Sequence, residues 1–430
     1  MNGPAGYAVP LKRPAVDVKR LADGGFIFRS PYGMRDAPAH AGVWLKTWAT
    51  AEPNRIFLVE KNDKGRKRSL SYEQAYASVQ QIAAALAAHG QGARRRVAAF
   101  AANTIDTALF HLAAAEAGMA LATFEPDATG DTLKTVLSDL APAVVYVDSR
   151  EQRYAVLELS HEVGAEAVAA DELKKWVKKR PKGPDVHGAS SPPVPSVGER
   201  LYFETATNLS GFGVAARNLT INQEAVAALL PPLGASAALA CGGSGWWEPA
   251  GTWGLLAVLR AGGTLHIGTA GEGIKPTFLL AHGHELPALT TEPKRLAALE
   301  RIVILGGAAD PALAATIQEL AIKARGQKVP LVWGYGAAGT GTLDALLYFD
   351  SDIPNNLGLP PPGSYLKLAP MGNDLELRVK PAGDVPLGWS SNGLAPRALD
   401  EDGFLATGDA AKLIDPMRPY LGMQWLGRLT

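Results

Sequence analysis

The spacing of apolar residues predicts a long helix in the first quarter of the chain. Ser71-Tyr-Glu-Gln74 has the Ser-x-x-Gln pattern of an N-terminal capping box, and Gly90 follows as a stop signal. Between these points, apolar residues recur every three or four positions, as one face of an α-helix requires. The residues of this face are Ala75, Val79, Ile82, Ala83 and Leu86.

Short apolar runs alternate with further helical segments up to about residue 150. Asn103-Thr104 is a polar pair suited to capping a helix over residues 105–117. Strands that alternate with helices at this spacing predict a parallel sheet covered by helices. The other segments expected here are helices at 44–48 and 132–140 and strands at 55–60, 97–101, 121–124 and 144–147.

A second alternating region follows residues 179–198, a segment rich in Pro, Ser and Gly that we interpret as a linker. After it we expect a strand, a loop up to Gly213, and a helix that begins at Thr220-Ile-Asn-Gln223. The strands expected in this region are 200–203, 264–267, 301–305 and 329–333.

From about Gly358 the pattern changes to alternation with period two. Two alternating runs, 365–368 and 375–379, flank Met-Gly-Asn-Asp, which is typical of a β-hairpin. The predicted fold class is therefore α/β, with two helix-covered, mostly parallel sheets and a small C-terminal β unit. The expected divisions are an N-terminal extension (1–40) that covers the surface, a first α/β subdomain (41–178), the linker (179–198), a second α/β subdomain (199–356) and a β-rich subdomain (357–430).

Charge and composition exclude several classes of protein. The 430 residues carry 42 basic and 42 acidic side chains, so we expect no net basic face for nucleic acid. The basic run Lys174 to Lys182 is interpreted as a solvated linker. Because there is no signal peptide and no apolar run of about 18 residues, we expect a soluble, cytoplasmic protein with no membrane partner.

Cysteine and histidine positions predict no metal centre. Cys241 is the only cysteine, and we interpret it as a small residue at a strand end, since no histidine lies near it in the sequence. His282 and His284 form a His-x-His pair without a third ligand, which is more typical of a loop than of a metal site.

Five separated motifs resemble those of adenylate-forming (AMP-binding) carboxylate–CoA ligases, in order and in spacing. The Thr-Gly-Asp ending of the fourth is the most specific. The chain resembles the N-terminal domain of that superfamily. Within the superfamily, the segments Arg94–Ile105 and Ala411–Pro416 are most similar to the feruloyl-CoA synthase group. The motifs are Leu305-Gly-Gly-Ala308, Trp333-Gly-Tyr-Gly-Ala-Ala-Gly-Thr340, Gly358-Leu-Pro-Pro-Pro-Gly363, Leu399-Asp-Glu-Asp-Gly-Phe-Leu-Ala-Thr-Gly-Asp409 and Trp425-Leu-Gly-Arg428.

The resemblance implies a nucleotide site. Asp409 matches the residue that accepts hydrogen bonds from ribose hydroxyls, and Arg428 matches a second ribose or phosphate contact. Tyr335 matches the ring that stacks on adenine. The other residues assigned to this site are Gly306, Gly307, Gly336 and Thr340. Plain structural roles remain open for them: a turn cap for Asp409, core packing for Tyr335 and a surface charge for Arg428.

The segment that matches the phosphate-binding loop has lost its lysine. Phe212 stands where the family has lysine, and Glu204 stands where it has threonine. Ala206 and Leu209 replace glycines and carry a Cβ, so they tolerate left-handed backbone less well. The residues left in this degenerate loop are Thr205, Thr207, Asn208, Ser210, Gly211 and Gly213. A surface turn is the alternative interpretation.

Other parts of the family's machinery are altered as well. The resemblance implies ATP or AMP as the ligand. Ala338-Gly339 replaces the family's Thr-Glu pair, whose glutamate holds Mg²⁺, so we expect no magnesium. The resemblance also implies an aromatic-acid pocket walled by Trp246, Trp247 and Trp333, with core packing as the alternative. The sequence ends at Thr430, where the family's hinge begins, so the lysine of the small C-terminal domain is not expected.

Three hypotheses therefore remain open. The chain is a ligase domain whose adenylation of an aromatic carboxylate is lost or severely impaired, because several charge-stabilising groups are replaced. Alternatively, it is a binding or regulatory protein that keeps a pocket for an adenine nucleotide or an aromatic acid. The third hypothesis is a scaffold subunit, with a second copy or an active ligase as its partner.

Overall fold

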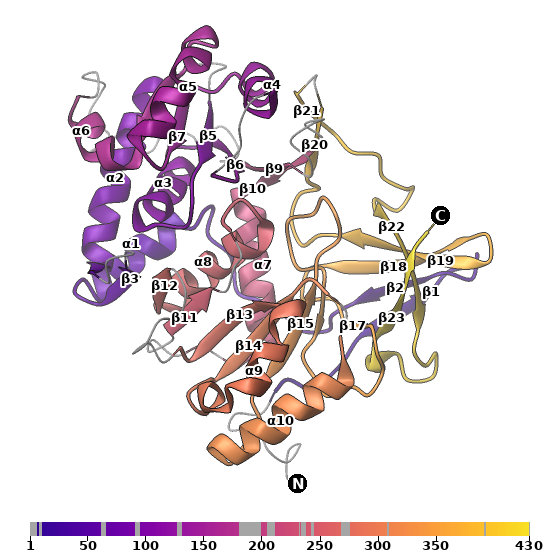
Figure 1. The fold of residues 1–430 in the computed structure, drawn as a ribbon. Helices are drawn as coiled ribbons and strands as arrows, with labels where there is room; N and C mark the ends of the chain where they lie inside the picture. Colours follow the sequence, from indigo (N-terminus) through magenta and orange to yellow (C-terminus); the bar gives the residue numbers. More distant parts are fainter. Residues whose placement is uncertain are drawn as a thin grey trace.

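The computed structural model describes residues 7, 11–61, 66–90, 95–126, 131–179, 199–203, 211–231, 233, 238–241, 245–267, 276–307, 309–390 and 393–429. These residues form three β-sheets with helices packed around the first two, as Figure 1 shows. The expected α/β class is confirmed, and each sheet draws on segments that lie far apart in the sequence.

The first sheet has the strand order β21-β20-β10-β9-β6-β5-β7-β8. Its strands from β9 to β8 run parallel, whereas β9, β10, β20 and β21 pair antiparallel. The strands are β5 (Arg96–Phe100), β6 (Ala120–Phe124), β7 (Val144–Val147), β8 (Glu166–Ala169), β9 (Glu199–Phe203), β10 (Gly211–Ala215), β20 (Leu387–Ser390) and β21 (Gly393–Ala395).

The second sheet has the order β16-β15-β14-β13-β11-β12-β3-β4, with antiparallel strands at its two edges and a parallel centre. Its central strands β13 and β14 are apolar except for one end residue each, as burial on both faces requires. The strands are β3 (Ile56–Lys61), β4 (Lys67–Ser71), β11 (Ala238–Cys241), β12 (Thr264–Ile267), β13 (Phe278–His282), β14 (Arg301–Leu305), β15 (Leu331–Tyr335) and β16 (Ala345–Leu347).

The third sheet is antiparallel, with the order β1-β2-β18-β19-β22-β23-β17. The predicted hairpin is confirmed, because β18 and β19 pair from Tyr365↔Lys380 to Met371↔Asp374. The strands are β1 (Asp17–Arg20), β2 (Phe26–Arg29), β17 (Asn356–Gly358), β18 (Tyr365–Met371), β19 (Asp374–Lys380), β22 (Leu405–Leu413) and β23 (Met423–Arg428).

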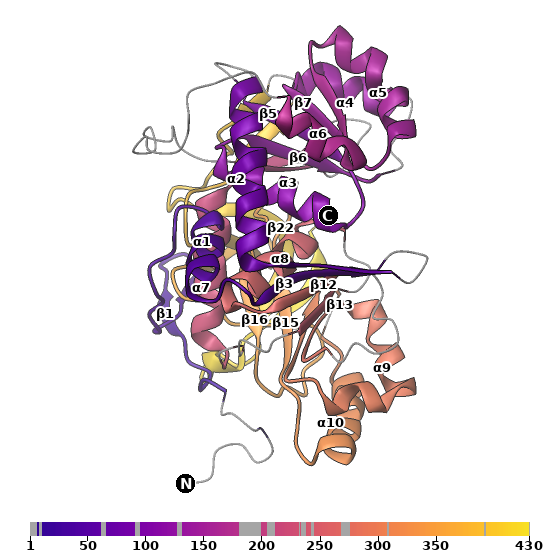
Figure 2. The same ribbon diagram turned by 90° about the vertical axis from the view of Figure 1, so that its left-hand side faces the viewer.

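Helices α4 to α6 gather at the end of the molecule that carries β5 and β7, and α9 and α10 lie at the opposite end beside β13 and β15, as Figure 2 shows. The helices are α1 (Gly42–Ala51), α2 (Tyr72–His89), α3 (Ile105–Glu116), α4 (Asp131–Leu140), α5 (Arg150–Glu162), α6 (Leu173–Lys178), α7 (Ala216–Leu229), α8 (Pro249–Ala261), α9 (Pro287–Thr291) and α10 (Pro311–Arg325).

Local signals in the sequence are confirmed. Ser71 and Gln74 form a reciprocal capping box on α2, and the predicted apolar face of that helix is buried. Thr104 caps α3 by accepting a hydrogen bond from the backbone N–H of Thr107. These interactions connect residues within three positions of one another, so the sequence alone can predict them.

Three local predictions are wrong. The N-terminal extension does not only cover the surface: β1 and β2 join the third sheet, and Phe28 is buried in its core. The basic run is not a linker at its start, because it begins inside α6, where Trp176 and Val177 are buried, although its described lysines are exposed as predicted. Helix α7 starts at Ala216 instead of Thr220, because β10 takes up residues 211–213 of the expected loop and leads directly into the helix.

The sheets do not follow the order of the chain. Strands β3 and β4 precede the expected linker, yet they lie in the sheet whose other strands follow it. In return, β9, β10, β20 and β21 complete the first sheet. Residues 180–198 of the linker lie outside the described residues. Among the residues described, no helix is both long and apolar enough to cross a bilayer.

Candidate functional site

A cavity of about 270 Å³ lies where the parallel strands β14 and β15 end. Gly306 and Gly307 follow β14 with φ of +69° and +91°, a backbone conformation that residues with a Cβ rarely adopt. The cavity is lined by five of the predicted nucleotide residues and by several residues that were not predicted. The predicted ones are Gly306, Gly307, Tyr335, Gly336 and Asp409, and the others include Trp425, Asn355 and Asn356.

Asp409 is buried at one wall of this cavity, and both of its carboxylate oxygens accept hydrogen bonds. Tyr335 Oη donates to Oδ2 at 2.6 Å. Trp425 Nε1 and Arg428 Nη1 each donate to Oδ1 at 3.2 Å. Burial, together with the Asp409 carboxylate, raises the pKa of Tyr335, so its hydroxyl stays a donor at neutral pH. Since a carboxylate offers about four acceptor positions, one on Oδ2 remains for a ligand.

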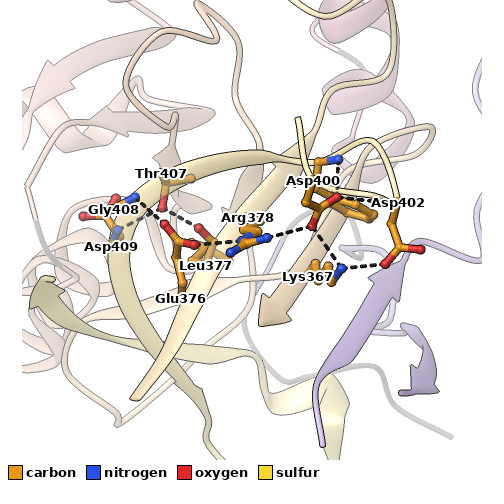
Figure 3. A network of polar contacts seen from close by, with 10 residues as sticks. Lys367, Glu376, Leu377, Arg378, Asp400, Asp402, Thr407, Gly408 and Asp409 are labelled. Atoms are coloured by element: carbon orange, nitrogen blue, oxygen red, sulfur yellow. Dashed lines mark hydrogen bonds and ion pairs between the residues drawn. The ribbon is translucent and has the colours of Figure 1, made fainter. Parts of the chain in front are cut away.

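The turn that carries Asp409 is held by a second carboxylate from the neighbouring strand β19. Glu376 Oε1 accepts from the backbone N–H of Gly408 at 3.2 Å, and Glu376 Oε2 accepts from Arg378 Nε at 2.7 Å. Thr407 Oγ1 donates to the Leu377 carbonyl oxygen at 2.5 Å. Figure 3 shows these contacts leading from the turn into the third sheet.

The network continues from Arg378 to a cluster of ion pairs. Arg378 Nη1 and Lys367 Nζ both lie 3.0 Å from Asp400 Oδ2, and Lys367 Nζ also lies 2.5 Å from Asp402 Oδ2 (Figure 3). Burial alone would raise the pKa of Asp400, but the Phe404 N–H and the two cations lower it to about 2. The network therefore ties the position of Asp409 to fixed charges in the sheet.

The loop between β15 and β16 is organised by Asp344, which is 1% exposed. Its carboxylate accepts from the Ala337 N–H at 2.9 Å, from Thr340 Oγ1 at 2.8 Å and from Thr342 Oγ1 at 3.1 Å. Burial raises the pKa of Asp344 to about 6, against the lowering effect of these three donors. Thr340 is therefore buried inside the loop and does not line the nucleotide-side cavity, although it was assigned to that site.

A second cavity, of about 670 Å³, adjoins the first and shares Gly306, Gly334 and Gly336 with it. Its walls combine four aromatic side chains with small and aliphatic residues, and Glu125, Glu248 and His282 also line it. His282 Nε2 lies 3.6 Å from Glu248 Oε2. The aromatic residues are Tyr202, Phe212, Trp247 and Trp253.

Phe212, at the position of the family's lysine, is 6% exposed. Its ring centroid lies 5.4 Å from that of Tyr202, and its edge fills the space in front of Gly341. Gly211 and Gly213 belong to β10 and pair with both β9 and β20, so they form strand and not loop. The other four residues of the predicted phosphate loop, Thr205, Thr207, Asn208 and Ser210, lie outside the described residues.

A cation that sequence reasoning missed lies at Gly339. Arg397 Nη1 donates to the Gly339 carbonyl oxygen at 2.8 Å. Gly339 has φ of +81°, and the guanidinium of Arg397 occupies the space that a Cβ at this position would need. Since Gly339 lies where the family has its magnesium-binding glutamate, a cation stands where a ligand carboxylate would be.

The three tryptophans predicted to form one aromatic-acid pocket lie in different places. Trp247 lines the aromatic cavity, whereas Trp333 lines the nucleotide-side cavity. Trp246 lies in the core at 1% exposure and lines none of these walls, since Asn103 and Arg200 bind its backbone. Arg428 reaches Asp409 from outside the cavity lining.

The donor set does not fit a magnesium ion. Within the described part of the chain, no group of three or more His, Cys, Asp or Glu residues is arranged to hold a metal. Gly339 has no side-chain oxygen, and Asp344 accepts three internal hydrogen bonds.

The chain is similar to known proteins in one sequence region and over the whole fold. Residues 45–203 match the family of AMP-binding enzymes. No curated protein sequence matches the chain. VinN is similar in structure, with a TM-score of 0.75 and 17% identity over 92% of this chain and 100% of VinN.

Two further structures show the same likeness. ATP-bound MatB from Rhodopseudomonas palustris has a TM-score of 0.68 and 18% identity over 90% of this chain and 79% of MatB. E. coli MenE, bound to a phenylether-linked analogue of OSB-AMS, has a TM-score of 0.67 and 16% identity over 92% of this chain and 78% of MenE. The chain therefore carries an AMP-binding enzyme match over residues 45–203 and has the fold of the large N-terminal domain of adenylate-forming enzymes.

Proposed function

We propose that this protein binds an adenine nucleotide and an aromatic carboxylic acid in the two adjoining cavities, and that its adenylation of the acid is lost or severely impaired. The observation that carries the proposal is the shared boundary of Gly306, Gly334 and Gly336. Because these glycines have no side chains, a carboxylate in one cavity can approach a nucleotide in the other.

The nucleotide-side cavity supports binding of the adenosine part. Asp409 retains one acceptor position on Oδ2 for a ribose hydroxyl, and the buried network behind it fixes its orientation. Tyr335 lines the same cavity and offers an aromatic face to a purine. The similar MatB structure holds ATP, which agrees with this assignment.

The larger cavity supports an aromatic acid as the second ligand. Four aromatic side chains line it, and its volume falls within the range of about 300–1,000 Å³ that is usual for small-molecule sites. A planar ring packs well against such walls, and its carboxylate would point toward the glycine boundary, away from Glu125 and Glu248. A hydroxycinnamate, as in feruloyl-CoA synthase, is the finer assignment that we propose.

Loss of adenylation follows from the charges around the glycine boundary. Phe212 replaces a lysine by an apolar ring, and Gly339 provides no ligand for a metal ion. Removing one group that stabilises transition-state charge costs on the order of 3 kcal/mol of barrier, and losses of several groups together remove most of the rate.

The test separates binding from catalysis. Pyrophosphate exchange into ATP should stay at the blank level with ferulate, coumarate and benzoate, and exchange well above blank would overturn the claim of impairment. Melting temperatures should rise with AMP and with ferulate, since both bind the folded state. Asp409→Ala should abolish the response to AMP and keep the response to ferulate.

A scaffold subunit is the second candidate. If neither AMP nor ferulate raises the melting temperature of the wild-type protein, the proposed binding function is wrong. The fold would then serve association with a second copy or with an active ligase, which the mass of the particle in solution would reveal.

A further inference from the structure

Arg200 on β9 is a buried cation that has no buried anion beside it in the described part of the chain. It is 6% exposed, and no ion pair within the described residues includes it. Two other shielded arginines have carboxylates nearby: Arg260 Nη2, on a side chain that is 22% exposed, lies 2.7 Å from Glu224, and the charge of Glu300 acts on the buried Arg301. Burial lowers the pKa of Arg200, but a guanidinium stays protonated at neutral pH. A charge of this kind is costly to bury unless a counter-ion accompanies it.

The hydrogen bonds of Arg200 leave donors unused. Its Nη2 donates to the Trp246 carbonyl oxygen at 2.5 Å and lies 3.3 Å from His111 Nδ1. Its Nε is buried and has no acceptor among the described residues. An unpaired donor on a buried cation indicates that an acceptor is missing at this place.

A small cavity lies beside these donors. It measures about 50 Å³ and is lined by Arg200, His111 and Thr252 together with apolar side chains of α3, α7 and α8. These helices and β9 meet near the centre of the molecule in Figure 1. A water needs about 10–15 Å³ of such space, so the cavity has room for a few waters or for one anion of the size of chloride, formate or acetate. It shares no lining residue with the two cavities of the proposed ligand site.

The histidine adds a second donor to the cavity. Burial and the charge of Arg200 lower the pKa of His111 well below its usual value, so the ring is neutral. Since Nδ1 faces the Arg200 guanidinium and accepts from it, the ring proton lies on Nε2. A neutral ring of this tautomer lining the cavity offers an N–H to an anion without adding charge.

We propose that Arg200 and His111 form a buried binding site for one small monovalent anion, a halide or a one- to two-carbon carboxylate, between β9 and helices α3, α7 and α8. The anion supplies the missing countercharge for Arg200 and an acceptor for its Nε. The site is separate from the proposed nucleotide and aromatic-acid cavities, so its test does not depend on them.

The test measures stability against anion identity at constant ionic strength. Sodium gluconate, whose anion is too large for the cavity, is replaced stepwise by chloride or by formate. The melting temperature of the wild-type protein should rise by at least about 2 °C between 1 and 100 mM of the small anion, because the anion binds only the folded state. Comparing the rise in melting temperature in chloride with the rise in formate shows whether the site prefers a halide or a small carboxylate.

Arg200→Met should remove this response, and Arg301→Met is the matched control. Arg301 is equally buried, at 6% exposure, but it lines no part of this cavity, so its variant should lose stability and keep the response. Equal responses in wild type and Arg200→Met, or none in either, would overturn the proposal and leave water in the cavity.

A direct measurement on the wild-type protein covers the case in which Arg200→Met does not fold. The ³⁵Cl NMR line in chloride buffer should broaden with protein concentration, and formate should narrow it again by competition. If formate does not narrow the ³⁵Cl line, chloride and formate do not compete for one site, and the proposal is contradicted.

Discussion

Two shielded aspartates near the candidate site show opposite electrostatic designs. Asp400, in the third sheet, contacts the cations Lys367 and Arg378, and its pKa is lowered to about 2. Asp344, in the loop between β15 and β16, accepts only from an N–H and two hydroxyls, and burial raises its pKa to about 6. The proposed adenosine side of the site is thus backed by fixed ion pairs, whereas the proposed phosphate side is held by neutral donors.

This contrast between ion pairs and neutral donors bears on which part of a nucleotide the proposed site can bind. Ribose hydroxyls need an oriented carboxylate, and the network behind Asp409 supplies the orientation. A triphosphate needs cations, and Phe212 and Gly339 supply none. Arg397 is a cation at the substituted loop, bound to the Gly339 carbonyl oxygen.

The largest expected effect is on the ion-pair side. Lys367→Met should lower the free energy of unfolding by about 3–5 kcal/mol, because it leaves Asp400 and Asp402 without a shared cation that is 5% exposed. Urea unfolding measures the change. Lys380→Met, at an exposed cation on the neighbouring strand, should cost less than about 1 kcal/mol. Similar costs for both variants would show that the network adds nothing to stability.

The second effect is a pH dependence at Asp344. Its folded-state pKa of about 6 exceeds the ordinary value of 3.8, so the folded protein holds this proton more tightly than the unfolded chain does. The stability of the wild type relative to Asp344→Asn should therefore rise as pH falls from 7 to 4.5, by about 2 kcal/mol. Urea unfolding at several pH values measures this double difference.

Asp400→Asn is the counterpart with the opposite sign. Because the pKa of Asp400 is lowered, its contribution is complete above about pH 4 and is lost as pH falls toward 2. Its difference from wild type should stay flat between pH 7 and 4.5. A flat profile for Asp344→Asn as well would contradict the contrast between the two aspartates.

The third effect concerns the missing cation of the phosphate side. Phe212→Lys should raise the affinity for ATP relative to AMP by about tenfold, since its ammonium can extend from the buried stem into the aromatic cavity. Isothermal titration with both nucleotides gives the ratio. Phe212→Leu removes the same ring without adding charge and should leave the ratio unchanged. An unchanged ratio in the lysine variant means that the phosphates lie elsewhere.

The smallest effect is expected at Arg397. If its guanidinium lies near the phosphates of a bound nucleotide, Arg397→Met should weaken ATP binding about fivefold, the value of roughly one hydrogen bond. Arg418→Met, at an exposed ion pair with Asp415, is the control and should bind ATP as the wild type does. A loss of the same size in both variants would remove Arg397 from the site.

The local parts of the fold were predictable. The α2 capping box and the β18–β19 hairpin depend on residues a few positions apart, and both are confirmed. Motif order along the chain was sufficient to expect the α/β class. The start of α7 was missed because Thr220 resembles a cap, whereas its hydroxyl lies inside the helix and binds the Pro38 carbonyl oxygen.

The candidate site divides in the same way. The residues Gly306, Tyr335 and Asp409 were named from their motifs, and one cavity brings them together. Arg397 was missed because it lies 58 positions from Gly339, and no spacing rule connects them. Trp425 lies in one of the motifs, but the motif predicts no role for it, whereas in the structure its indole N–H donates to Asp409.

The sequence by itself determined the α/β class, the local caps and the order of the glycine-rich turns, and its resemblance to the family indicated the loss of lysine and glutamate from two motifs. Only the tertiary structure decided which polar groups meet: Asp409 with Arg428, Arg397 with the Gly339 carbonyl oxygen, and Arg200 with no carboxylate among the described residues. The physical reason is range. Caps and turns form between neighbours in the chain. Whether a charge has a partner depends on residues tens or hundreds of positions away, which the pairing of strands brings near it.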